Sequence, residues 1–160
     1  MTFGLPGQPT CPLVFLQPTS LDNQEQMAGV AKPQMPRILV VDDEESVRTF
    51  AERVLRDAGY EVVIASDGPE ALRLVEQQRP FDLFVIDLVM PLMSGDELAR
   101  HLRRADPDMK VLYFTGYSDR LFQEKSTLWE NEAFVDKPIT IKGLLEAVSL
   151  LLFGHSHGPH

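Results

Sequence analysis

Cysteine is nearly missing from this 160-residue chain, because Cys11 is the only one. No internal disulfide can form, so nothing calls for an oxidising compartment. No apolar run looks long enough to span a membrane. Basic residues are in deficit, with 15 Lys and Arg against 24 Asp and Glu and a formal net charge of -9, which disfavours direct binding to nucleic acid. Residues 1–31 contain no Lys or Arg, so the basic start of a secretory signal is missing and we expect a cytoplasmic protein.

Proline and histidine mark off the two ends of the chain. Residues 1–36 hold six of the twelve prolines and show no sustained apolar period, which predicts a flexible Pro-rich extension. Residues 154–160 carry three of the four histidines on a Gly/Pro tail that lacks the fixed surroundings of metal ligands, so we predict a disordered tail. Residues 37–153 remain as one globular domain.

Short apolar runs alternate with helix-period segments in this domain. Five runs are rich in β-branched and aromatic residues and predict strands; they cover 38–41, 62–65, 83–86, 111–114 and 133–135. Apolar residues at helical spacing lie between them, most clearly over 47–58, before Gly59. Strands that are apolar on both faces indicate a parallel sheet buried between two helical layers. The predicted fold class is therefore α/β.

Polar residues follow four of the predicted strands at the same relative position. They are Asp42, Asp43, Asp87, Thr115 and Lys137. The carboxyl ends of parallel strands form a crevice in an open α/β sheet, so these side chains are expected to converge there. Taken singly, each has an ordinary alternative as a helix cap, a turn residue or a surface charge.

Three gathered carboxylates would repel one another and raise at least one pKa unless a cation lies among them. Mg²⁺ suits such a crevice because it takes one or two carboxylates and leaves positions for water and phosphate oxygens. Lys137 would supply a mobile positive charge for a phosphoryl group, and Thr115 a hydroxyl donor. The pattern therefore favours a magnesium-dependent phosphoryl site.

Four short motifs at these positions resemble those of the response-regulator receiver domain. They are VVDDEE at 40–45, VIDLVMPLMSG at 85–95, FTG at 114–116 and DKP at 136–138, in family order and at family-like spacing. The resemblance covers about residues 37–153. It implies a flavodoxin-like fold with five parallel strands in the order 2-1-3-4-5 and five helices distributed over both faces.

The resemblance also implies a role for each site residue. Asp87 would be the phosphoacceptor, taking a phosphoryl group from a phosphohistidine on a sensor histidine kinase or phosphotransfer protein. Asp42, Asp43, Asp87 and the backbone carbonyl of Val89 would bind Mg²⁺. Thr115 and Lys137 would contact phosphoryl oxygens.

A conformational switch is implied as well. Phe134 matches the aromatic position that turns inward when the hydroxyl of Thr115 moves toward the phosphate, and the Lys137–Pro138 bond matches one that is often cis in the family. Phosphorylation would then bias a two-state equilibrium and alter a protein-interaction face. Leu121, Phe122 and Trp129 lie in or near that face, although ordinary core positions remain open for the first two.

The sequence departs from the family pattern at several positions. Val89, two residues after Asp87, and Tyr117, two after Thr115, occupy places that tune phosphate loss in relatives. The apolar Val89 offers no donor to orient water, so we expect slow self-hydrolysis of the phosphate. Asp136 is less usual than an apolar residue and is expected to face solvent.

The sequence therefore predicts a stand-alone receiver rather than an enzyme. The residues after Leu152 are too few for an output domain, so output would be contact with a downstream protein or onward passage of phosphate. One alternative is a receiver detached from a hybrid histidine kinase that acts as a phosphate sink or modulator. An aspartate-nucleophile phosphohydrolase and a degenerate, purely protein-binding receiver are the remaining alternatives, and the missing DxD motif disfavours the former.

Overall fold

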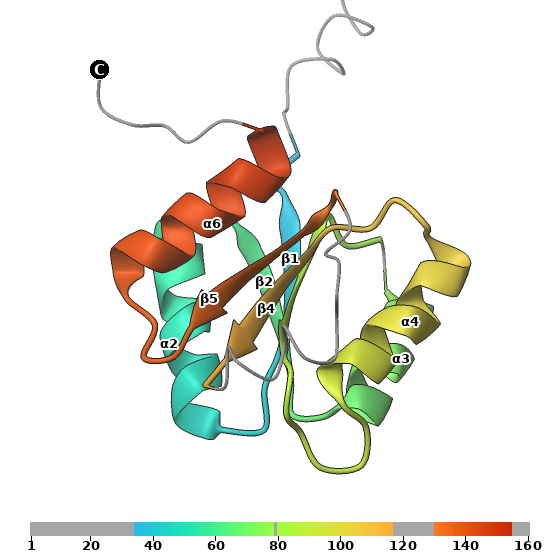
Figure 1. Cartoon of the computed structure of the whole chain (residues 1–160). Coiled ribbons are helices and arrows are strands. Elements are labelled where there is room, and N and C mark those ends of the chain that lie inside the picture. The colour runs from blue at the N-terminus through green and yellow to red at the C-terminus, as the bar shows by residue number, and fades with distance from the viewer. Residues whose placement is uncertain (1–33, 79, 117–129, 155–160) are drawn as a thin grey trace, which may run out of the picture. The chain divides into compact units, whose positions relative to one another are not determined.

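The computed structural model describes residues 34–78, 80–116 and 130–154 (Figure 1). The extension predicted for residues 1–36 lies almost wholly outside this range, as do Tyr117, Leu121, Phe122 and Trp129. The tail predicted from Gly154 onward also lies outside it, apart from Gly154 itself. No helix among the described residues is both long enough and apolar enough to cross a membrane.

Five parallel strands form the central sheet in the order β2-β1-β3-β4-β5, which confirms the predicted order. The strands are β1 (Arg37–Val41), β2 (Glu61–Ala65), β3 (Leu83–Asp87), β4 (Val111–Thr115) and β5 (Glu132–Asp136). Each contains the predicted apolar run and extends it by one or two residues. As a result Asp87 and Thr115 are the last residues of β3 and β4 rather than the first residues beyond them.

Helices cover both faces of the sheet (Figure 1). The described helices are α2 (Glu45–Asp57), α3 (Gly68–Gln77), α4 (Gly95–Ala105) and α6 (Ile141–Phe153). Helices α2 and α6 pack on one face, and α3 and α4 cover the other. The structure thus describes four helices where five were predicted, because the segment between β4 and β5 at 117–129 is outside the described residues.

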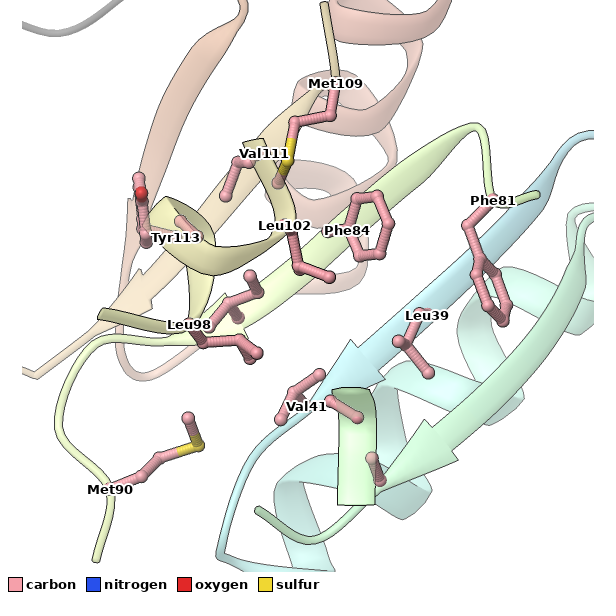
Figure 2. Close-up of a cluster of buried hydrophobic side chains, with 14 of the residues drawn as sticks. Leu39, Val41, Phe81, Phe84, Met90, Leu98, Leu102, Met109, Val111 and Tyr113 are labelled. Atoms are coloured by element: carbon pink, nitrogen blue, oxygen red, sulfur yellow. The ribbon is translucent and has the colours of Figure 1, made fainter. Parts of the chain in front are cut away.

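Two apolar cores separate the sheet from these helices. Alternate residues of each strand enter opposite cores, so in β1 Leu39 and Val41 face α3 and α4, whereas Ile38 and Val40 face α2 and α6. Figure 2 shows Leu98 and Leu102 of α4 over the strand residues of the first core. Both cores contain fully buried leucine and isoleucine side chains. Burial of this kind stabilises the sheet by roughly 1.5–3 kcal/mol per large side chain.

Side-chain caps begin three of the four described helices. Asp67 accepts the Glu70 amide at 2.8 Å before α3, and Thr140 accepts the Gly143 amide at 3.0 Å before α6. Ser94 accepts the Glu97 amide at 3.2 Å before α4. Helix α2 differs, since Glu44 at its N-cap makes no side-chain cap bond. The carboxylate of Glu44 is used elsewhere, in the site at the carboxyl edge of the sheet.

Candidate functional site

The register of the sheet brings the predicted site residues to one edge. Val41 pairs with Ile86, Asp87 with Phe114, and Thr115 with Asp136, so these neighbouring strands end within one residue of one another. Residues 83 and 85 of β3 face α2 and α6. Asp87 continues that alternation. Asp42, after Ile38 and Val40, and Lys137, after Ala133 and Val135, continue it in the same way. These three side chains therefore belong to one side of the sheet edge.

Three carboxylates meet at this edge, as the sequence predicted. One carboxylate oxygen each from Asp42, Asp43 and Asp87 lies within 4.8 Å of the others. Asp42 is fully buried and Asp87 is 4% exposed, whereas Asp43 is exposed. The cluster therefore has one side open to solvent and two of its carboxylates withdrawn from it.

Lys137 joins the cluster from the residue after β5. Its Nζ lies 3.1 Å from Oδ2 of Asp42, 3.5 Å from Oδ2 of Asp87 and 3.4 Å from Oε1 of Glu44. The backbone amide of Lys137 donates to the carbonyl of Thr115 at 2.8 Å, which fixes the point where the chain leaves the sheet. The bond from Lys137 to Pro138 is cis. One ammonium thus serves several carboxylates, and the cluster keeps an excess of negative charge.

The residues present fit a hard divalent cation such as Mg²⁺. All three carboxylates offer oxygen ligands at close range. Oδ2 of Asp42 is buried and accepts no hydrogen bond from the described residues. Nζ of Lys137 lies 3.1 Å away and forms an ion pair with this oxygen. A buried carboxylate oxygen without a hydrogen bond is costly, and a metal ligand bond would satisfy it.

Burial changes the acid–base behaviour of the cluster. Burial first, and then repulsion from Asp42, raise the pKa of Asp87 to about 7, although Lys137 and the amide of Val89 act in the opposite direction. Burial likewise raises the pKa of Asp42 above its ordinary value. For Lys137, burial alone would lower the pKa, but the nearby Asp42, Asp87 and Glu44 hold it above the usual value. Lys137 therefore stays charged, while Asp87 titrates near neutrality.

The remaining predicted site residues belong to β4, to β5 and to the loop after β3. Thr115 is fully buried at the end of β4. Phe134 is half-buried in β5, where it pairs with Tyr113 and packs on the core under α3 and α4. The amide of Val89 donates to Oδ1 of Asp87 at 3.3 Å, and the Val89 side chain is 47% exposed. Asp136 is exposed, as predicted.

Two residues contribute to the site although the sequence prediction gave them no role. Glu44 and Gly95 lie within the quoted motifs but were not assigned to the site. The carboxylate of Glu44 pairs with Lys137, which is 93 residues away in the chain. The amide of Gly95 donates to the carbonyl of Leu88 at 2.9 Å, and the backbone of Gly95 lies against that of Asp87. The acidic character of Glu44 was a signal for the first contact, whereas nothing local predicts the second.

A groove with a volume of about 490 Å³ opens beside Lys137. It runs between the start of α2 and the residues after β5, with Val47, Phe50 and Ile139 as its large apolar lining. Glu44 and Lys137 belong both to this groove and to the carboxylate cluster. The groove is therefore continuous with the site.

Comparisons with known proteins agree with this geometry. The family model described as the response regulator receiver domain matches residues 38–149. The response regulator receiver protein CpdR of Brucella abortus (strain 2308) is 33% identical over 118 residues, which cover 74% of this chain and 98% of CpdR. The sensor kinase CckA of the same strain is 36% identical over 116 residues, which cover 72% of this chain but 12% of the kinase.

A solved structure supports the same relationship. The response regulator protein TrrA from Thermotoga maritima, described in complex with Mg²⁺-BeF, is 36% identical with a TM-score of 0.65. The match covers 74% of this chain and 100% of that one. The sequence identity to these proteins extends over nearly all of the described sheet and its helices. The chain also has the acidic cluster and the lysine at the sheet edge. The chain belongs to the response regulator receiver domain family of two-component signalling.

Proposed function

We propose that Asp87 accepts a phosphoryl group from a phosphohistidine on a sensor histidine kinase or phosphotransfer protein. The observation that carries the proposal is the buried Asp87 carboxylate, with two further carboxylates within 4.8 Å and the Lys137 ammonium 3.5 Å away. Receiver domains are signalling domains rather than classical enzymes, so the chemistry ends on the protein itself. The chain acts as an acceptor in a phosphorelay.

The transfer uses the carboxylate of Asp87 as the nucleophile. One of its oxygens forms a bond to phosphorus as the bond from phosphorus to the imidazole nitrogen breaks, and the imidazole keeps that electron pair. The carboxylate must be ionised to attack: without a cation its pKa is raised to about 7, and Mg²⁺ bound beside it would favour the ionised form. Lys137 pairs with a transferred phosphoryl oxygen, and Thr115 donates its hydroxyl to another.

Asp42, Asp43 and Asp87 would hold Mg²⁺, with the backbone carbonyl of Val89 as a further ligand. When bound, the ion neutralises part of the charge that otherwise keeps two anions apart. Asp43 is the exposed member of the cluster and marks its solvent side, where a partner can approach. The structure of TrrA, described with Mg²⁺-BeF, supports a magnesium site in a similar domain.

Thr115 and Phe134 form the proposed switch. The aspartyl phosphate adds charge and acceptor oxygens that one arrangement of Thr115 and Lys137 satisfies best, so modification biases a pre-existing equilibrium. Phe134 is half-buried in β5. Movement of the Thr115 hydroxyl toward the phosphate would leave space for the Phe134 ring to turn inward. A downstream protein would read the changed face, with no direct contact to nucleic acid or membrane.

Similarity to the receiver of a hybrid kinase favours a second candidate. The chain matches 12% of the sensor kinase CckA at 36% identity, and it is 38% identical to a solved receiver domain from a hybrid histidine kinase CckA. In this second role the protein takes phosphoryl groups from such a kinase without its own output and works as a phosphate sink. A stand-alone relay differs from a sink in having a downstream target that binds the phosphorylated form.

Intact-mass measurement tests the proposed chemistry. The parent and Asp87→Asn are incubated with acetyl phosphate and Mg²⁺, and parallel samples contain a chelator. The parent is expected to gain one phosphoryl group with Mg²⁺ and little without it, whereas Asp87→Asn gains none. Equal labelling of parent and variant, or no labelling of the parent, contradicts the proposal. Continuous release of phosphate from a generic phosphate ester would instead indicate a phosphohydrolase.

A further inference from the structure

Arg48 of α2 contacts the backbone of the acidic loop. Its Nη1 donates to the carbonyl oxygen of Asp42 at 2.6 Å, and the side chain is only partly exposed. An arginine that bonds a carbonyl with its cationic group makes one of the stronger hydrogen bonds in proteins. The contact is therefore a firm link between the first turn of α2 and the residue that supplies a buried carboxylate.

The other polar atoms of Asp42 are also in contact with neighbouring groups. Its amide donates to the carbonyl of Ala65 at 3.2 Å, Oδ1 accepts the amide of Glu44 at 2.9 Å, and Oδ2 pairs with Lys137 at 3.1 Å. The carbonyl oxygen is the remaining polar atom of Asp42, and it accepts the hydrogen bond from Arg48. The orientation of Asp42 is thus determined from all sides, and Arg48 supplies the contact at the carbonyl.

The carbonyl of Asp42 belongs to the peptide unit that leads into Asp43. Because that unit is planar, a bond to the carbonyl oxygen restricts its rotation. Rotation of this unit would change the direction in which the chain enters Asp43, whose carboxylate lies in the cluster with those of Asp42 and Asp87. A single contact from Arg48 therefore affects two of the three carboxylates.

The charge of Arg48 also acts on Glu70 in the first turn of α3. The amide and hydroxyl of Ser66 both donate to Oε2 of Glu70 at 2.7 Å. These bonds are the main reason why the pKa of Glu70 is lowered, and the charges of Arg73 and Arg48 contribute further. Arg48 therefore bonds the Asp42 carbonyl, and its positive charge also acts on Glu70.

We propose that Arg48 is a positioning residue that orients Asp42 and Asp43 for binding Mg²⁺. The inference rests on the proposed function, because it assumes that these carboxylates hold the ion. Two effects of Arg48 oppose each other: ordering of the ligands strengthens binding of the cation, whereas its positive charge weakens it. Contacts of this kind around metal ligands typically change affinity by about 10–100-fold, so ordering dominates.

Arg56 on the same helix provides a matched control. Its Nη2 donates to the carbonyl of Val62 at 3.0 Å and pairs with Glu52 at 2.9 Å. Arg48 and Arg56 both link α2 to a backbone carbonyl, but eight residues separate them, which is about 12 Å along a helix. Replacing either with methionine removes a similar bond, and only the Arg48 bond concerns the acidic loop.

Titration calorimetry with Mg²⁺ on the full chain tests the proposal. Arg48→Met is expected to bind Mg²⁺ about tenfold more weakly than the parent, and Arg56→Met about as well as the parent. Thermal unfolding in a chelator shows whether both variants are folded. Should Arg48→Met fail to fold, Arg48→Gln removes the charge and shortens the side chain while keeping a polar group, and the same weakening is expected. Unchanged or tighter Mg²⁺ binding in the folded Arg48 variant overturns the proposal, as does equal weakening in Arg56→Met.

A second readout separates positioning from a general structural role. The rate of phosphoryl uptake from acetyl phosphate is measured against the concentration of Mg²⁺. Arg48→Met is expected to need about tenfold more Mg²⁺ for half the maximal rate, with a maximal rate within about twofold of the parent. A loss confined to the maximal rate contradicts the positioning role.

The outcomes also distinguish this inference from the proposed function. A parent that binds Mg²⁺ but takes up no phosphoryl group contradicts the proposed function, and the calorimetric comparison of Arg48→Met with Arg56→Met still decides the inference. A parent that binds no Mg²⁺ overturns the inference itself.

Discussion

Gly95 lies directly against the backbone of Asp87. A Cβ at position 95 would be 2.3 Å from the carbonyl oxygen of Asp87 and 3.0 Å from its carbonyl carbon. Backbone atoms cannot move aside as the end of a flexible side chain can, so the start of α4 and the end of β3 approach this closely only with glycine at position 95. The glycine therefore positions the end of β3, which carries Asp87, as well as the helix.

We predict that Gly95→Ala destabilises the protein by about 1–3 kcal/mol, the usual cost of inserting a methyl group into a packed site. Chemical denaturation of the parent and the variant measures this difference. Gly116→Ala is the control, because a Cβ there meets none of the described atoms within 4 Å. An alanine at position 95 that costs no more than one at position 116 would contradict the packing described for Asp87.

The raised pKa of Asp87 predicts how stability depends on pH. The folded protein holds this proton up to a pKa of about 7, far above the ordinary value of 3.8, so this group favours folding at low pH and the benefit is lost as pH rises through 7. Asp87→Asn is therefore expected to stabilise the metal-free protein at pH 8, on the order of 1–4 kcal/mol, and to have little effect near pH 4.

Denaturation curves in chelator at both pH values measure the effect of Asp87→Asn. Addition of Mg²⁺ at pH 8 should raise the stability of the parent more than that of the variant, since the cation offsets the repulsion among the carboxylates. If the substitution stabilises the protein more at pH 4 than at pH 8, the raised pKa of Asp87 is wrong.

Lys137 offsets the negative charge of the cluster, so its removal should be costly. Lys137→Met leaves Oδ2 of Asp42 buried without its ion pair and is expected to destabilise the metal-free protein at pH 8 by about 1–3 kcal/mol. Urea denaturation in a chelator measures the loss. The effect should shrink at pH 5, where Asp87 is protonated.

Lys142→Met is the comparison for Lys137→Met. The Lys142 side chain is 83% exposed and pairs with Glu146 at 3.8 Å, so its loss is expected to change stability by less than about 0.5 kcal/mol. Similar losses for the two lysine variants would mean that Lys137 is an ordinary surface charge.

Val89 predicts a long-lived aspartyl phosphate. Its side chain is 47% exposed beside Asp87 and provides no donor that could orient an attacking water. The protein is labelled and the acetyl phosphate is then removed. The parent is expected to lose its phosphoryl group several-fold more slowly than Val89→Asn. A time course of the phosphorylated fraction by mass spectrometry measures both rates, and a parent that loses phosphate as fast as the variant rejects the role of Val89.

The fold was predictable because its signals are local. Short apolar runs and helix-period stripes mark the elements, and Gly59, where the stripe of α2 ends, has a positive φ of 97°. The ends of the strands were less predictable. Asp87 and Thr115 interrupt the apolar pattern, yet both continue the ladder, so the apolar runs alone place these two strand ends one residue early. The helix expected between β4 and β5 had poor periodicity and falls outside the described residues.

The site was predictable in its residues but not in its contacts. Parallel strands end together, so Asp42, Asp87 and Lys137 were expected to converge from their positions alone. The pairing of Glu44 with Lys137, the bond from Arg48 to Asp42 and the approach of Gly95 to Asp87 depend on side-chain reach and on helix placement. Sequence patterns of this kind carry no information about such contacts, which depend on how the folded segments are placed.

Localisation of the phosphoryl group tests the central claim most directly. After incubation with acetyl phosphate and Mg²⁺, the acyl phosphate is reduced with borohydride and the labelled residue is identified by peptide sequencing in the mass spectrometer. The modification is expected at Asp87 alone. A modification at Asp42, Asp43 or a histidine, with Asp87 unmodified, would contradict the assignment of Asp87 as the phosphoacceptor.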